Sequence, residues 1–198
     1  MADRLHLSYW IRGFQQNNMI RAYEKMLRLF PVSKLSRGQS TLRIHAISFQ
    51  EPPVLEREFN DPLPMEDVIP LLREYSSPDA GYELETRWDL WQWENDDWSV
   101  QPTRASLRCF GPEFDADLGE NLHVDFGLDS TFLPQPDIPG SFSLIQSNIR
   151  SLLKLVHDLD NAFLVEKRSL WSESGGNFAQ RLQSALQDED ASEEEALE

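Results

Sequence analysis

The stretch WDLWQWENDDW, residues 88–98, carries four of the chain's six tryptophans and decides how the middle of the chain folds. An aromatic-rich segment that begins at Tyr82 leads into residues 94–97, ENDD, whose side chains favour turns. The residues after the turn favour a return strand that ends near Phe110. The pattern therefore predicts a β-hairpin over residues 82–110, with an interruption near Pro102 because proline cannot donate to a strand ladder.

Regular alternation divides the tryptophans of this hairpin between two faces. Trp88 has the same parity as Leu84 and Leu90, so it is expected in the core. Trp91 and Trp93 have the opposite parity and are the candidates for surface recognition. A β-bulge near Leu90 or Trp91 would shift the register and turn both inward, so the sequence leaves their exposure open.

The first fifty residues predict a strand, a helix and a second strand. Residues 5–12 alternate apolar and polar side chains, which is the period of a half-buried strand. Residues 17–30 switch to the helical period, with an asparagine available as the cap and Pro31 after the end. Residues 41–49, TLRIHAISF, have apolar side chains at both parities and predict a strand in the middle of a sheet.

Residues 51–80 hold six of the chain's twelve prolines. Such a density opposes any long regular element, so this segment is expected to be a proline-rich connector within one domain. A short helix from Pro64 is compatible with the apolar spacing, and Pro70 is a point where that helix can break in two.

Two strong patterns follow the hairpin. Residues 121–132, NLHVDFGLDSTF, show the clearest alternation in the chain and predict another strand. Residues 141–164 predict a long helix whose apolar face, about half of the circumference, suits the covering of a sheet. The predicted order is β-α-β-connector-β-β-β-α, an α+β fold in which helices cover one face of a two-layer, mostly antiparallel sheet.

The C-terminal residues are expected to lie outside the main domain, which is assigned to residues 1–174. The segment SESGG breaks the pattern after Trp171, and residues 175–187 predict a short appended helix with Phe178 and Leu182 on one side. This helix could dock into a partner's groove or fold back onto the chain's own core. Residues 188–198 hold seven acids and no base, which predicts a disordered, solubilising tail.

The net charge of −16 comes from 34 acids against 18 bases and is unevenly distributed. Residues 1–45 have eight Lys or Arg against two acids, whereas residues 79–137 have fourteen acids against three arginines. A chain this acidic repels phosphate, which argues against direct binding to nucleic acid or to an anionic membrane. The expected partner is a protein with a basic surface, and homodimerisation stays open.

The first predicted helix carries a basic stripe, Arg21, Lys25 and Arg28, that could hold phosphate or complement the acidic region. The single cysteine, Cys109, cannot form an internal disulfide and is interpreted as a small buried hydrophobe. No apolar run approaches eighteen residues, and the N-terminus lacks the zones of a signal peptide. A cytoplasmic location away from the membrane is expected.

The chain contains no phosphate-binding glycine loop, no GxSxG elbow, no CxxC and no HExxH, and no cofactor is expected. The best enzymatic alternative is a metal site of two histidines and a carboxylate, formed by His123, Asp125 and the distant His157. His123 and Asp125 leave the same face of a predicted strand, but contact with water explains polar residues on that face equally well. For His6 and His45 the spacing supplies no partner.

The sequence favours a non-enzymatic protein–protein interaction module of the adaptor, chaperone-like or immunity type. The motivation is an acidic, tryptophan-bearing sheet surface without a catalytic set of residues. The candidate partner-binding residues are Trp91, Trp93, Asp89, Asp96 and Asp97. Two alternatives stay open: a metal-dependent enzyme with a His-x-Asp site, and an acidic mimic of nucleic acid that inhibits a basic nucleic-acid-binding protein.

Overall fold

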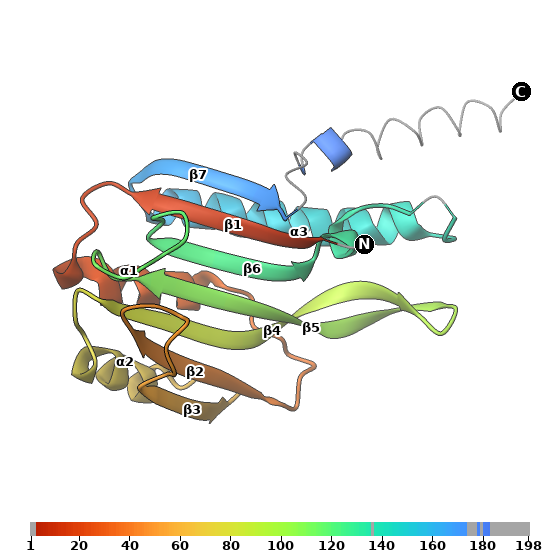
Figure 1. Ribbon diagram of the computed structural model, residues 1–198. Coiled ribbons are helices and arrows are strands. Elements are labelled where there is room, and N and C mark those ends of the chain that lie inside the picture. Colours follow the sequence, from red (N-terminus) through yellow and green to blue (C-terminus); the bar gives the residue numbers. More distant parts are fainter. Residues whose placement is uncertain (1–2, 136, 174–177, 179, 183–198) are drawn as a thin grey trace, which may run out of the picture.

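The computed structural model describes residues 3–135, 137–173, 178 and 180–182, and in it seven strands form one open antiparallel sheet (Figure 1). The order across the sheet is β3-β2-β4-β5-β6-β1-β7. The strands are β1 (Arg4–Ile11), β2 (Gln39–Ala46), β3 (Leu55–Asn60), β4 (Ala80–Glu94), β5 (Asp97–Phe110), β6 (Leu122–Leu128) and β7 (Val165–Ser172). The helices are α1 (Gln16–Leu29), α2 (Met65–Glu74), the short 3₁₀ helix η1 (Asp129–Phe132) and α3 (Ser141–Ala162). The predicted mixture of helices with an antiparallel sheet is confirmed.

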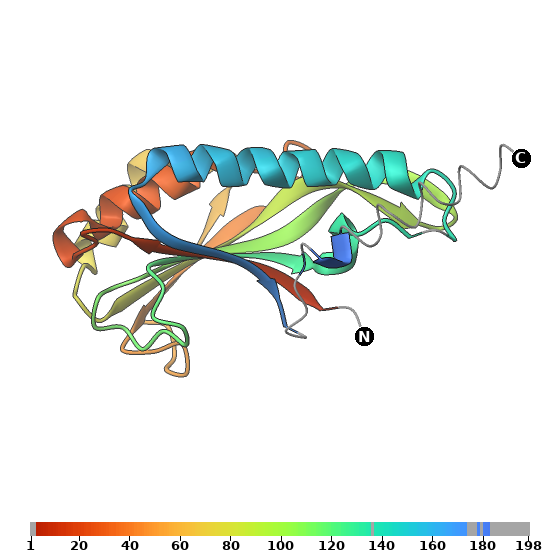
Figure 2. The same cartoon turned by 90° about the horizontal axis from the view of Figure 1, so that it is seen from above.

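Figure 2 shows α1 and α3 along one side of the sheet. Hydrogen bonds tie both helices to this side: the Tyr23 hydroxyl of α1 donates to the Leu107 carbonyl at 2.8 Å, and the Tyr9 hydroxyl of β1 donates to Val156 of α3 at 3.3 Å. On the other side lie the loops of residues 47–54 and 111–121 (Figure 2). The backbone N–H of Asp115 joins these two loops by donating to the Ile47 carbonyl at 2.7 Å.

The predicted hairpin is confirmed as β4 and β5, which pair along their whole length. Asn95 and Asp96 form the turn with φ of 54° and 63°, the two positive angles that a two-residue type I′ turn requires. The expected interruption at Pro102 is wrong, because β5 continues through it opposite Asp89. Counted from the turn, Pro102 is at a non-hydrogen-bonded position, so its missing N–H costs no ladder bond.

Residues 51–80 contain more regular structure than the connector that their prolines predict. Strand β3 lies between the prolines at 52–53 and 62–64 and pairs with β2, at one edge of the sheet. Helix α2 follows and passes through Pro70 without a break. The prolines thus flank the strand and leave its ladder intact, which their density alone did not reveal.

A second strand missed by the sequence pattern is β7, which follows α3 and pairs with β1 at the opposite edge. Its middle residues Glu166, Lys167 and Arg168 are charged and exposed, as is common for edge strands that avoid pairing with other molecules. These three charged residues interrupt the apolar–polar alternation by which the sequence would have predicted a strand. The expected appended helix of residues 175–187 is described only at residues 178 and 180–182, and the expected tail of residues 188–198 lies outside the described residues.

Candidate functional site

The distal half of the β4–β5 hairpin projects beyond the rest of the sheet (Figure 1). Strand β2 pairs with β4 only as far as Glu85, and β6 pairs with β5 only from Ser106 onwards. In the part of the chain that the structure describes, residues 86–105 therefore pair with no strand outside the hairpin. We call residues 91–100 the hairpin tip.

The tryptophans of the hairpin occupy different environments. Trp88 is 4% exposed, as its parity predicts, and its ring lies 5.6 to 6.1 Å from the rings of Phe30, Phe126 and Phe132. Trp91 and Trp93 are half-buried, so the structure presents part of each indole to solvent without turning either fully outward. The sequence did not single out Trp98, which is also half-buried and lies opposite Trp93 with ring centroids 5.6 Å apart.

The hairpin tip is fastened to α3 and to the loop before it. Asn148 of α3 is 2% exposed. Its side-chain oxygen accepts a hydrogen bond from the Trp91 backbone N–H, and its side-chain nitrogen donates to the Trp91 and Thr131 carbonyls, all at 2.9 Å. The Trp98 indole N–H donates to the Pro139 carbonyl at 2.7 Å. Because Trp91 is at a non-hydrogen-bonded position of the hairpin, its backbone groups face the free edge of β4, where Asn148 replaces the missing strand.

The acidic residues that were predicted to bind a partner lie in two different environments. Asp96 and Asp97 lie exposed at the hairpin tip. Asp89 instead accepts hydrogen bonds from the Ser33 hydroxyl and from the backbone N–H groups of Lys34 and Leu35, the latter two at 2.7 and 3.3 Å. The carboxylate of Asp89 orders the chain after α1, whereas Asp96 and Asp97 are exposed.

Further acids of the strands are neutralised within the sheet. Arg43 of β2 lies between three carboxylates and contacts Glu56 at 2.6 Å, Glu85 at 3.2 Å and Glu83 at 3.6 Å. Glu83 also accepts a hydrogen bond from Arg108 of β5 at 2.8 Å. These carboxylates are matched by arginines and are not arranged as free negative charges.

A second polar cluster lies on β1, on β6 and in the loop before β6, on the side of the sheet away from α3. His6 Nδ1 is 3.2 Å from His123 Nε2, and His123 Nδ1 is 3.2 Å from both Glu120 Oε1 and Ser8 Oγ. These four residues are buried. Trp171 of β7 covers them, since its ring stacks on His6 at 4.4 Å and its indole N–H donates to Ser8 at 3.2 Å.

The cluster forms a chain of hydrogen bonds from a carboxylate through two imidazoles. With Glu120 ionised, His123 donates through Nδ1 and accepts at Nε2 from His6, which leaves the Nε2 of His6 as an acceptor. Because both ring nitrogens of His123 are engaged, neither is open to a metal ion. Ser8 shares one nitrogen of His123 with Glu120, whereas a nucleophilic triad needs the hydroxyl and the acid on opposite nitrogens.

The structure does not bring the predicted metal ligands together. His157 is exposed on α3, on the other side of the sheet from His123, and shares a hydrogen bond with Asn161. Asp125 accepts two hydrogen bonds from Arg4, at 2.7 and 2.9 Å. Among the described residues no group of three His, Cys, Asp or Glu side chains could hold a metal ion.

Burial and hydrogen bonding shift two pKa values in the cluster. Burial lowers the pKa of His6 and outweighs the opposing effects of Asp125 and Glu173, with His123 and Arg4 lowering it further. Burial raises the pKa of Glu120, but the hydrogen bond from His123 and the backbone bonds prevail and the net pKa is lowered. The folded chain thus favours a neutral His6 and an ionised Glu120.

Acidification is therefore expected to destabilise the protein in two steps. The contribution of His6 is complete above its ordinary pKa of 6.5 and decreases as the pH falls below it, because the unfolded chain then binds the proton first. The contribution of Glu120 is complete above its ordinary pKa of 4.5 and is lost as the pH falls through the lower folded pKa. Urea unfolding midpoints measured from pH 7.5 down to about pH 3 will show both decreases.

The His6→Gln variant tests the first step. Its unfolding midpoint should decrease less between pH 7.5 and pH 5.5 than that of the original chain. The exposed His157 offers a matched control, since His157→Gln should leave the pH dependence unchanged. Equal slopes for all three proteins would contradict the assignment.

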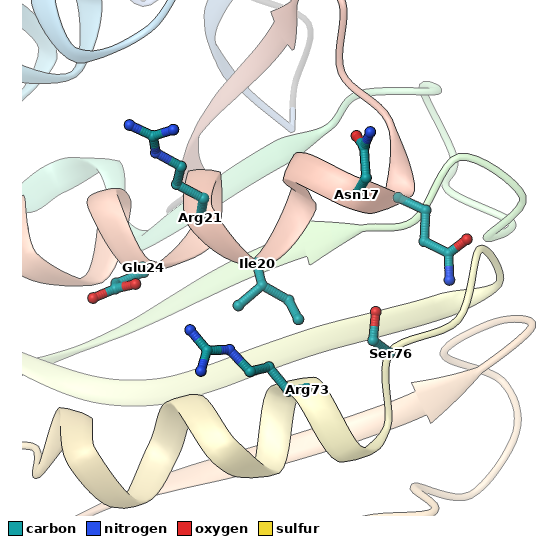
Figure 3. A pocket seen from close by; sticks show the side chains of 7 residues that line it. Asn17, Ile20, Arg21, Glu24, Arg73 and Ser76 are labelled. Carbon is teal, nitrogen blue, oxygen red and sulfur yellow. The ribbon is translucent and has the colours of Figure 1, made fainter.

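A cavity of about 660 Å³ lies between α1 and α2. Figure 3 shows Arg73 of α2 reaching toward Ile20 and Glu24 of α1, whereas Arg21 points away from α2. The two guanidinium groups do not converge, so the cavity lacks the paired cations of a phosphate site. The other members of the predicted basic stripe are engaged internally: Arg28 bonds Glu24, and Lys25 donates to the Ala162 carbonyl.

Comparison with protein-family models, with curated proteins and with solved structures gives no match for this chain. No helix among the described residues is long and apolar enough to cross a membrane.

Proposed function

We propose that this protein is a non-enzymatic interaction module that binds a protein partner with a basic surface through the hairpin tip. The observation that carries the proposal is the tip itself: a self-paired ribbon outside the main sheet that presents three half-buried tryptophans beside exposed acids. Tryptophan is the residue most enriched at the energetic centres of protein interfaces.

The tip has the physical properties that favour tight binding. Its tryptophans are partly packed already, because Trp93 contacts Trp98 and the Trp98 indole is bonded to Pro139, so binding immobilises few additional rotamers. Asn148 holds the ribbon in place from α3. Exposed Glu94, Asp96 and Asp97 at the turn would steer a basic partner and form the polar rim around the aromatic centre.

The other two function classes have less support from the geometry. The His123 and Asp125 side chains are engaged by Glu120, His6 and Arg4, which leaves no open ligand set for a metal-dependent reaction. Mimicry of nucleic acid needs free carboxylates at regular intervals, whereas Arg43 and Arg108 neutralise those of the central strands.

Capture of a partner with charge-reversed variants tests the proposal. The Asp96→Lys/Asp97→Lys variant and the original chain are immobilised and exposed to lysate of the source cell at low and moderate salt. A protein retained by the original chain should be lost from this variant, because the reversed tip repels a basic surface. The Trp93→Ala variant should weaken retention by about 2 kcal/mol or more, as for a central interface aromatic.

Asp115→Lys/Asp117→Lys is the matched control, since both acids are exposed on the loop of residues 111–121 and the charge change is identical. This control should retain the partner. Absence of any retained protein, or equal loss from both charge variants, would overturn the proposal. Addition of double-stranded DNA separates it from mimicry, because DNA would displace the partner only if the tip imitated nucleic acid.

A further inference from the structure

Of the C-terminal residues that the structure describes, 178 and 180–182, three have side chains that contact the main domain. Phe178 is 1% exposed and belongs to the hydrophobic core, and Leu182 packs partly against it. Arg181 donates to the carboxylate of Asp129 in η1 and lies 3.5 Å from Asp3, just before β1. An apolar and a charged anchor at i and i+3 is the pattern by which a short amphipathic helix binds a receptor surface.

Asp129 makes this contact unusual because it is a carboxylate at 1% exposure. Arg181 is the only cation within ion-pair distance of Asp129 among the described residues. A buried charge without a partner is strongly unfavourable, so the site of Asp129 requires a cation that comes from outside the sheet and its covering helices. In this chain that cation is Arg181, the only basic residue after Arg168.

The connection between this segment and the sheet contains Gly175 and Gly176, the chain's only adjacent glycines. These two glycines have no side chain that could hold the segment to β7. Among the described residues of the segment, Phe178, Arg181 and Leu182 make the contacts with the domain.

We propose that Asp3, Asp129 and the apolar surface under Phe178 form a receptor site for a helical segment with an aromatic residue and an arginine at i and i+3. The chain's own Phe178 and Arg181 occupy this site, and a peptide of the same chemistry can occupy it in trans. The site is separate from the hairpin tip, and the test of this proposal does not depend on the proposed function.

The probe is a fluorescent peptide with the sequence of residues 174–187, titrated against full-length protein and followed by anisotropy. The original chain should bind it weakly, because the covalently attached segment competes at high effective concentration. The Phe178→Ala/Arg181→Ala variant should bind it at least about tenfold more tightly, since the two anchors carry the internal contact. A probe with alanine in place of Arg181 should lose this binding.

Asp129→Asn in the same double-variant background identifies the receptor residue and should weaken peptide binding by about tenfold or more. Circular dichroism and a cooperative unfolding transition establish that each variant is folded. Should the double variant fail to fold, the single variant Arg181→Gln is titrated instead, with a smaller expected gain because the buried Phe178 still holds the internal segment. A folded variant that binds the peptide no better than the original chain would refute the receptor site.

Discussion

Replacement of Trp88 by alanine is expected to lower the free energy of unfolding by about 3–5 kcal/mol. Trp88 is the point where four elements meet: it lies on β4, and its ring contacts Phe30 at the end of α1, Phe126 of β6 and Phe132 of η1. Truncation removes a large buried side chain and leaves a cavity that three further aromatic rings line. Urea unfolding followed by circular dichroism measures the loss.

Trp93→Ala is the matched control for Trp88→Ala, because both residues lie on β4 and lose the same atoms. Trp93 is half-buried and contacts Trp98, so its replacement should cost much less stability while it weakens partner binding. Equal destabilisation by the two variants would show that the hairpin tip belongs to the core and is not a surface for recognition.

Replacement of Asn148 by alanine is expected to lower the free energy of unfolding by about 2–3 kcal/mol. The Trp91 N–H and the carbonyls of Trp91 and Thr131 lose their side-chain partner. These three bonds are part-buried, so water replaces some of them and the total stays within the cost of one fully buried group, about 1–3 kcal/mol. The same change should loosen the hairpin tip. Hydrogen exchange at the Trp91 amide is then expected to speed up more than exchange in the central part of β4.

Asn161→Ala provides the control on the same helix, since Asn161 is exposed and bonds only the His157 side chain in the described structure. It should change neither stability nor exchange at Trp91. Unaltered Trp91 exchange in Asn148→Ala would contradict the view that α3 holds the tip in place.

Helices and strands whose apolar residues repeat at a regular spacing were predictable from the sequence. The alternation around Trp88 and the residues ENDD predicted the hairpin and the burial of Trp88. The spacing of Ile145, Ile149 and Leu152 predicted α3. The signal for Asn148 was also present, because this polar residue lies on the same stripe, three positions after Ile145, where an unpaired amide would be costly.

Strands at the sheet edges were not predictable in this way. Strand β7 carries charges that mask its period, and β3 is hidden by flanking prolines. Edge strands pair on one side only, so selection against aggregation rewards such residues there.

The sequence by itself determined the hairpin, the long helix and the inner strands of the sheet, because these depend on contacts within a few residues and on one repeating apolar face. Tertiary structure alone decided the rest. It joined His6 to His123, placed Asn148 on the edge of β4, and supplied the buried Asp129 with Arg181. The physical reason is that hydrogen-bond partners and countercharges are selected by position in space, and residues so far apart along the chain share no local pattern that records their meeting.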